Sequence, residues 1–142
     1  MSKWGSISFE ELKKFQSELE QREREHSKFC ESITNEIAAR LLRKVKMKTP
    51  VGIYPSGSGR VGGTLRRNWN VDGAARRDGN DYVVAVINPT EYASYVEYGH
   101  RMRNGGWCEG RYMLTNSTDE IQKIAPRLIE QRIKQWLGGL VK

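Results

Sequence analysis

The chain has 142 residues and a formal net charge of +7, with 37% hydrophobic and 29% charged residues. This length fits one domain with a modest core, and no apolar run approaches the roughly 20 residues that a membrane span needs. The first ten residues lack the apolar stretch of a secretory signal, and two cysteines are too few for a disulfide scaffold. We therefore expect a soluble protein, made in a cytoplasm, with reduced thiols and no membrane contact.

The positive charge is concentrated in one segment. Residues 29–67 carry eight Lys or Arg and two Glu, whereas residues 1–28 carry six basic and six acidic residues. The excess lies between Arg40 and Arg67. Such a patch fits a polyanionic partner or an acidic protein surface. The more ordinary interpretation is a basic helix end that complements the helix dipole.

Helical periodicity dominates the first third of the chain. Ser8 with Glu11 predicts a capped helix start, and a polar stretch over 20–28 is either the exposed middle of one long helix or a break between two. The apolar residues recur at helical spacing on both sides of that stretch: Phe9, Leu12, Phe15 and Leu19 before it, and Phe29, Ile33, Ile37, Leu41 and Val45 after it. The second helix must end near Lys48, because Pro50 disfavours helix at the residue before it. We divide the chain into a polar helical extension, 1–28, and a domain, 29–142.

A glycine-rich loop follows the helix. Its glycines are Gly52, Gly57, Gly59, Gly62 and Gly63. Three of them form a G-x-G-x-x-G pattern, but no strand precedes it and no helix is expected after it, so a dinucleotide site is rejected. We expect this loop to be flexible in the isolated protein and to become ordered on assembly.

The second half alternates short elements with a final helix. Segments 65–75 and 81–88 predict an antiparallel hairpin with its turn at 76–80. Residues 91–98 form one or two helical turns, a basic loop follows, and 107–114 predicts a short strand. The last helix is expected over 117–137, bent or broken at Pro126 and ended by Gly138-Gly139.

These elements predict an α+β fold, in which an antiparallel β-sheet packs against a long N-terminal helix and a C-terminal helix. Ile33, Ile37 and Leu41 are expected to face the sheet together with Ile124 and Leu128.

No constellation of catalytic or metal-binding residues stands out. His26, Cys30, His100 and Cys108 lack the usual zinc-site spacings. A Cys108–His100 pair would also need an orienting group and an activated thiolate. We expect no enzyme, no metal and no cofactor.

Aromatic residues interleaved with basic ones suggest an alternative function, a non-specific nucleic-acid-binding module. The set comprises Trp69, Tyr92, Tyr95, Tyr98 and Trp107 near Arg66, Arg67, Arg101, Arg103 and Arg111. The competing interpretation is that these rings form the core or a subunit interface. DNA contact, if present, should be weak and lost with salt.

Three segments in order resemble the small tail-component family of tailed bacteriophages, described as minor tail, tail-completion or head-tail joining proteins. Lys48-Thr49-Pro50-Val51 and then Gly63-Thr64-Leu65-Arg66-Arg67-Asn68-Trp69 resemble its K-x-T-P-V-D-T-G-x-L-R-x-S. The run 92–100, YASYVEYGH, is similar to Y-A-x-Y-V-E-x-G-H, and 107–114, WCEGRYML, is similar to G-W-V-x-G-R-F-M-L. The Asp-Thr-Gly after Thr-Pro-Val is replaced by Gly52 and a longer loop.

The resemblance, which covers roughly residues 30–137, implies an α+β domain without catalytic residues. It also implies a structural component of a phage or prophage tail or neck, assembled as a ring at the top of the tail or at the head-tail joint. Such a protein would be made in the host cytoplasm and end in the virion, next to other tail or connector proteins. Because we expect the helices and the sheet to bury the apolar residues, the free protein should be a monomer or weak oligomer.

A ring needs two complementary patches on each subunit, for which we nominate the basic segment 40–67 and the acidic-aromatic segment 91–98. The candidate interface residues are Arg66, Arg67, Tyr92, Tyr95, Glu97, His100, Arg101 and Arg111. Glu97 is expected to pair with an arginine, either Arg66 of the same subunit or one of a neighbour.

Overall fold

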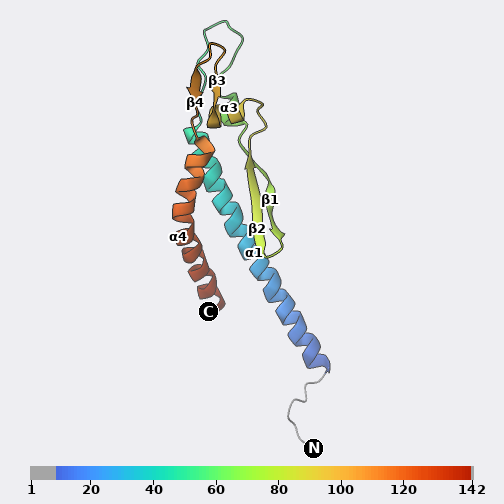
Figure 1. Cartoon of the computed structure of the whole chain (residues 1–142). Helices are drawn as coiled ribbons and strands as arrows, with labels where there is room; N and C mark the ends of the chain where they lie inside the picture. The colour runs from blue at the N-terminus through green and yellow to red at the C-terminus, as the bar shows by residue number, and fades with distance from the viewer. Residues whose placement is uncertain (1–8, 142) are drawn as a thin grey trace, which may run out of the picture.

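The computed structural model describes residues 9–141 and has a mixed α+β architecture (Figure 1). Its elements in chain order are α1 (Phe9–Lys48), α2 (Thr64–Arg67), β1 (Asn70–Asp78), β2 (Asp81–Ile87), α3 (Ala93–Tyr98), β3 (Gly99–Arg101), β4 (Trp107–Glu109) and α4 (Met113–Val141). Helix α1 contacts both the β1–β2 hairpin and α4, and α4 runs antiparallel to it (Figure 1). No helix among the described residues is long and apolar enough to cross a membrane.

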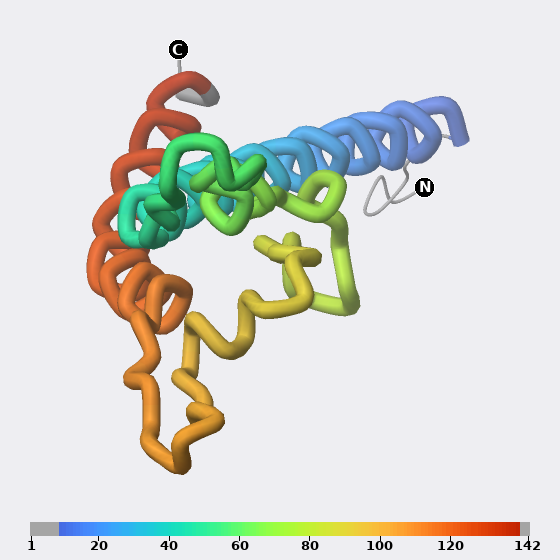
Figure 2. The backbone as a smooth tube through the Cα atoms, turned by 90° about the horizontal axis from the view of Figure 1, so that it is seen from above, coloured from blue at the N-terminus to red at the C-terminus, as the bar shows by residue number. Residues whose placement is uncertain are grey.

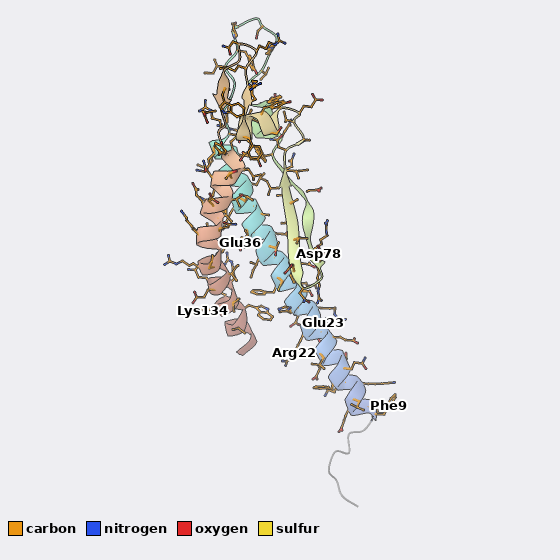
Figure 3. The ribbon with its side chains drawn as sticks, viewed as in Figure 1. Phe9, Arg22, Glu23, Glu36, Asp78 and Lys134 are labelled. Atoms are coloured by element: carbon orange, nitrogen blue, oxygen red, sulfur yellow. The ribbon has the colours of Figure 1, made fainter. Side chains whose placement is uncertain are left out.

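Helix α1 is one continuous helix of 40 residues, so the polar stretch 20–28 is its exposed middle and not a break. The predicted cap Ser8 lies outside the described residues. The boundary placed at residue 28 falls inside this helix. Residues 9–26 are all exposed, because α1 extends past the ends of α4 and the hairpin (Figure 3). Its first apolar residues are therefore not consumed internally, contrary to the expectation from the sequence.

The β1–β2 hairpin differs from the prediction at both ends of β1. Thr64–Arg67 forms one helical turn, so the strand begins at Asn70 and not at Leu65. The helical turn is favoured because it places Leu65 in the buried core. In a strand, Leu65 and the next residue, Arg66, would point to opposite faces. At the far end, β1 continues through the predicted turn to Asp78, which pairs with Asp81.

The region after α3 was also predicted incompletely. Within residues 9–141 the strands form two separate two-stranded antiparallel sheets. Gly99–Arg101, which was expected in a basic loop, is a strand, β3, and pairs with β4. Strand β4 ends at Glu109, short of the predicted 114.

Helix α4 is longer than the predicted 117–137. It starts at Met113 and runs through Pro126 and the Gly138-Gly139 pair to Val141. Proline removes one backbone hydrogen bond from a helix interior, but α4 lies along α1 and continues as one helix past Pro126.

The core is small and lies where the end of α1 meets α2 and the start of α4. Its buried members are Val45, Leu65, Trp69 and Met113. Further down, Ile37 and Leu41 face the β2 side chains Val83 and Val86, as expected. Leu128 is buried and Ile124 is 40% exposed, but α4 packs mainly against α1, so these two residues do not face the sheet as expected.

Ion pairs join the two long helices along their length. Arg132 donates from Nε to one Glu36 oxygen at 2.9 Å and from Nη2 to the other at 2.7 Å. Nearer the core, Lys44 and Lys48 reach Glu120 at 3.0 and 2.6 Å. Hydrogen bonds from Arg132 hold the pKa of the Glu36 carboxyl below its usual value, and Arg40 adds to this. These contacts fix the register of α4 on α1.

We predict that Glu36→Gln lowers the free energy of unfolding by about 1 kcal/mol at pH 7. Because the folded-state pKa of Glu36 is depressed, the stabilisation is present above the unfolded value of about 4.3 and is lost as pH falls through the folded value. Urea unfolding of both proteins at pH 7 and pH 3 measures this, and the difference should shrink at pH 3.

The matched control is Glu130→Gln, which removes an exposed pair with Lys134 inside α4 alone. It should change stability by less than about 0.5 kcal/mol at either pH. An equal effect of the two substitutions would contradict a role for Glu36 in joining the helices.

Candidate functional site

A buried threonine joins the end of α1 to the elements that follow the glycine-rich loop. Thr49 is 1% exposed, and its hydroxyl donates to the Val45 carbonyl at 2.5 Å. The same oxygen accepts the indole N–H of Trp69 at 2.8 Å. Its backbone carbonyl accepts two hydrogen bonds from the Arg66 guanidinium, at 3.1 and 2.7 Å. The Thr-Pro and Leu-Arg-Arg-Asn-Trp segments thus meet in one junction.

Amides brace the same junction from the other side. Asn88 donates to the Leu65 carbonyl at 2.8 Å, and Asn68 donates to the Thr90 hydroxyl at 2.9 Å. The segment between β2 and α3 is therefore bonded to α2. From the sequence, Asn68 was expected inside the strand 65–75 and Asn88 at the end of the strand 81–88, and nothing in the sequence identified their partners.

Glu97 caps the N-terminus of α4. Its side chain is in a buried residue, 5% exposed, and its two oxygens accept the backbone N–H groups of Leu114 and Thr115, each at 2.9 Å. The Thr115 hydroxyl adds a third bond at 2.7 Å. A carboxylate is favourable at this position because the helix dipole and unpaired N–H groups attract negative charge. This explains why α4 begins earlier than predicted.

The proposed pairing of Glu97 with Arg66 is therefore wrong. Arg66 is bonded to the Thr49 carbonyl, and the Glu97 carboxylate is occupied by the end of α4. Burial also makes Glu97 a poor candidate for pairing with a neighbouring subunit.

Two glycines allow the chain to cross itself at the base of the β3–β4 hairpin. A Cβ at Gly110 would collide with the Glu97 carbonyl, and one at Gly99 would meet the Cys108 carbonyl at 2.5 Å. Gly99 also has a φ of 88°, which side-chain-bearing residues rarely adopt. A hydrogen bond stabilises the crossing: the backbone N–H of Arg111 donates to the Val96 carbonyl at 2.7 Å.

Aromatic and basic side chains are exposed around the crossing, on α3, on the β3–β4 hairpin and at the residues that flank them. We call this set the tip surface; its members are Tyr92, Tyr95, Tyr98, His100, Arg101, Trp107 and Arg111. Figure 2 shows the β3–β4 hairpin projecting away from the rest of the chain. Five of its members were candidate interface residues from the sequence, while Tyr98 and Trp107 were considered there for nucleic-acid stacking or as part of a core or subunit interface.

The glycine-rich segment exposes a second group of apolar side chains. Residues 52–63 contain no helix or strand, and we define the loop surface as Val51, Ile53, Tyr54 and Val61, all exposed. Gly62 packs so closely on the Gly52 carbonyl that a Cβ would overlap it, which brings the two ends of the loop together. The mobility expected of this loop stays a prediction.

The basic segment 40–67 is partly used within the chain. Lys44 and Lys48 pair with Glu120, Arg66 binds Thr49, and Arg67 donates to the Gly62 carbonyl at 3.0 Å. These contacts hold four of the eight basic side chains in place, but the bonds to carbonyls leave the charges of Arg66 and Arg67 uncompensated. Trp69 is buried too, so it is not available for base stacking.

The candidate metal ligands fall in two places. Cys30 Sγ lies 3.6 Å from His26 Nε2 on α1, whereas His100 and Cys108 face each other across β3 and β4. Burial, with a smaller contribution from Glu31, raises the pKa of the Cys30 thiol. This favours the protonated form and not a nucleophilic thiolate. Among residues 9–141 no group of three or more His, Cys, Asp or Glu is arranged to hold a metal ion.

Comparison with known proteins identifies one family. Its model, described as "Bacteriophage HK97-gp10, putative tail-component", matches residues 13–99, more than half of the chain. The match includes the junction at Thr49 and the run that ends at Gly99, but not the segment 107–114. Searches of curated proteins and of solved structures find no significant match.

We predict that Thr49→Val destabilises the protein by about 1–3 kcal/mol, because the buried indole N–H of Trp69 loses its acceptor. Denaturant unfolding measures this. Thr34→Val is the matched control, since Thr34 makes the same type of bond to the carbonyl four residues earlier, at 2.8 Å. A cost for Thr49→Val no larger than that of the control would show that the Trp69 bond adds nothing.

A second prediction concerns the cap. Glu97→Arg should cost more than the roughly 1–2 kcal/mol of an ordinary lost cap, because it places a cation at the positive end of α4. Thermal unfolding followed by circular dichroism measures this. Glu91→Arg, at an exposed position just before α3, should leave the midpoint within about 2 °C; equal midpoints for the two variants would contradict the capping role.

Proposed function

The chain belongs to the HK97-gp10-like family of bacteriophage tail components, and on that premise we propose that it works at the tail end or head-tail joint as a homo-oligomeric ring. The role of this family is structural, in the virion, in contact with other phage structural proteins. Tail completion or head-tail joining is the function that best fits the arrangement of its surfaces.

The observation that carries this proposal is that the residues resembling the family motifs are bonded inside the chain, whereas the exposed side chains of the β3–β4 hairpin are not. Thr49, Arg66, Trp69, Glu97 and Gly99 all lie in the segments that resemble the family, and all act inside the chain. What they hold in place is a projecting hairpin with exposed aromatic and basic side chains. Tyr, Trp and Arg are the residues that contribute most to protein interfaces.

A closed ring requires two different patches that fit each other on neighbouring subunits. The tip surface and the loop surface supply them. Both lie at the same end of the molecule (Figure 1), and seen from above the hairpin and the 52–63 loop point in different directions (Figure 2). We propose that the tip surface of one subunit contacts the loop surface of the next. This contact replaces the charge pairing of 40–67 with 91–98, because Glu97 is buried and several of the basic residues are engaged inside the chain.

Assembly is expected to occur only on a tail or connector. The loop surface has few apolar residues, so a single contact is weak, and the contacts add up around a ring. The free protein is then a monomer or weak oligomer. The ring would order the glycine-rich loop.

Non-specific nucleic-acid binding remains the alternative function. With Trp69 buried, it would depend on exposed rings and on Arg101, Arg103 and Arg111 of the hairpin. Such contacts are mainly to phosphates, so binding should be weak, independent of sequence and abolished by salt.

The proposal predicts the effect of removing two exposed rings from the tip surface. Tyr95→Ala with Tyr98→Ala should leave the far-ultraviolet circular dichroism and the unfolding midpoint almost unchanged. In a phage whose own copy is inactivated, this variant should lower the yield of infectious particles by about 100-fold or more, since about 3 kcal/mol is lost at each subunit contact. Electron microscopy should then show separate heads and tails.

Ile124→Ala is the control, because Ile124 is also a large exposed side chain but lies about three turns into α4, away from the glycine-rich loop and the β3–β4 hairpin. It should support normal yields. Normal yields from the double tyrosine variant would exclude the tip surface as an assembly contact.

A further inference from the structure

The two strands of the β1–β2 hairpin differ in how their free edges are protected. On β1, the Ala75 N–H donates to the Asn35 side chain of α1 at 2.7 Å, and a bulge between Asp72 and Arg76 interrupts the strand. Bulges and charged residues keep a strand edge from pairing with other chains. Residues 82–87 of β2, YVVAVI, contain no charge and no proline. Within residues 9–141, β1 is the only strand paired with β2.

The backbone of β2 therefore offers hydrogen-bonding groups on its outer side. Asp78 and Asp81 are paired across a two-residue turn, and the pair that closes such a turn exchanges both backbone hydrogen bonds. These groups alternate along a strand, so Asp81 bonds to β1, whereas the N–H and C=O groups of Tyr82, Val84 and Val86 point away from it. Such a row is a template for one further strand.

An apolar groove lies beside this edge, with α1 as its floor. The Tyr82 hydroxyl donates to the Ser27 hydroxyl of α1 at 3.1 Å, so the side chains of residues 82, 84 and 86 face the helix. The groove has a volume of about 390 Å³. On the α1 side it is lined by Thr34, Ile37, Ala38 and Leu41. At about 3.6 residues per turn, Ile37 and Leu41 lie between the side of α1 that contacts β2 and the side that contacts α4.

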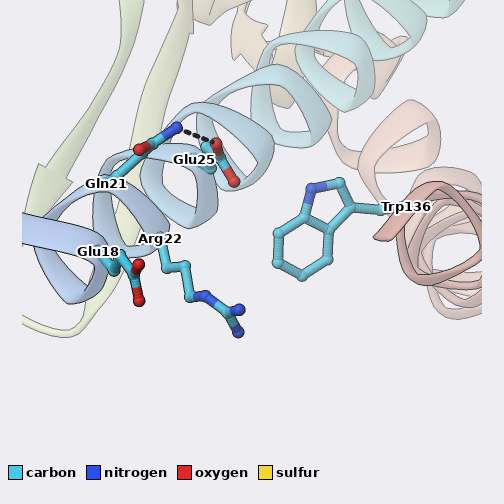
Figure 4. Close-up of a pocket in the computed structure, with 5 residues that line it drawn as sticks. All are labelled: Glu18, Gln21, Arg22, Glu25 and Trp136. Carbon is cyan, nitrogen blue, oxygen red and sulfur yellow. Dashed lines mark hydrogen bonds between the residues drawn. The ribbon is translucent and has the colours of Figure 1, made fainter. Parts of the chain in front are cut away.

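Helix α4 forms the far wall of this space. A second hollow, of about 470 Å³, shares Thr34 and Tyr82 with the first and reaches Ile129, Ile133 and Trp136 of α4. Beyond Trp136 the space between the two helices is polar. There α1 contributes Glu18, Gln21, Arg22 and Glu25 (Figure 4). The apolar space beside β2 is therefore bounded by α4 and, toward the start of α1, by charged side chains.

These boundaries decide what can occupy the groove. The unpaired edge requires an extended backbone, because the N–H and C=O groups of a docked helix are bonded within that helix. A twofold axis that paired two β2 strands would place both α1 helices on one face of the joined sheet, and the second α1 would fall where α4 lies. The loop 52–63 of a second copy is a poor strand, because it contains five glycines and a proline.

We propose that β2 binds an extended segment of another protein, about six residues long, as a third strand of the β1–β2 sheet. The added strand is antiparallel to β2, which is the more stable pairing. Every second side chain of the segment is apolar and covers Ile37 and Leu41, while the alternate side chains face solvent. This contact is separate from the tip and loop surfaces and does not depend on the ring.

Methylation of a peptide backbone tests the strand pairing. The probe is Lys-Thr-Val-Thr-Val-Thr-Val-Thr-Lys with a fluorophore at one end, and its valines pair with Tyr82, Val84 and Val86. In the antiparallel arrangement the valine N–H groups point to β2 and the threonine N–H groups point away. Fluorescence anisotropy with the full chain should show that N-methylation of the three valines weakens binding by about tenfold or more. N-methylation of three threonines, the matched control, should change it by less than about threefold.

A variant of the chain locates the bound peptide. Ile37→Gln places a polar side chain in the groove and should weaken binding of the unmethylated peptide by about tenfold. Ile53→Gln, on the loop surface, is the control and should bind like the wild type. Circular dichroism and the unfolding midpoint verify that both variants are folded. The comparison of the two methylated peptides uses the unaltered chain, so it stays decisive even where Ile37→Gln is unstable.

Several outcomes would overturn the proposal. They are no binding of the unmethylated peptide at up to about 1 mM, equal binding of the two methylated peptides, tighter binding of the valine-methylated one, or undiminished binding by a folded Ile37→Gln variant. Self-association in sedimentation equilibrium that Ile37→Gln abolishes would also overturn it, since a second copy would then occupy the groove. The double tyrosine variant of the tip surface should bind the peptide normally, which separates this test from that of the ring.

Discussion

The fold depends on the buried hydroxyl and carbonyl of Thr49. A helix that ends before a proline leaves carbonyl groups without partners, and at this end they are satisfied by Arg66 and by the Thr49 side chain. The same hydroxyl accepts the Trp69 indole, which would otherwise be buried without a partner. One residue therefore fixes α2, the start of β1 and the end of α1 together. This is why a small core of Val45, Leu65, Trp69 and Met113 suffices there.

Glu97, at the other side of the core, likewise satisfies the unpaired backbone groups of a helix end. A short helix ends in a carboxylate that caps a long one, and the Gly99–Gly110 crossing lets the two backbones approach. Because α4 is capped from α3, its direction along α1 is set at its first turn, and the ion pairs of Glu120 and Glu36 then fix its register. The hairpin beyond the crossing carries no share of this framework. Its side chains are available for contacts with other proteins.

Exposed aromatic and apolar side chains lie at both ends of the elongated molecule. The tip and loop surfaces lie beyond the Thr49 junction, and Phe9, Leu12, Phe15 and Leu19 lie exposed at the start of α1 (Figures 1 and 3). Part of the positive charge serves the fold itself, since Lys44 and Lys48 bind Glu120 and Arg66 binds the Thr49 carbonyl.

The sequence by itself determined that two long helical segments, the β2 strand and the family motifs are present. These depend on local signals: apolar residues at four-residue steps from Phe29 to Val45, the proline after Thr49, β-branched residues in β2, and three motifs in order. Only the tertiary structure decided what the motif residues do. Glu97 looked like an exposed ion-pair partner and is a buried cap, and Leu65 looked like the start of a strand and lies in a helical turn. The reason is physical: a carboxylate or a leucine is equally compatible with several local environments, and its partner, the end of α4 or the Thr49 junction, is brought to it only by folding.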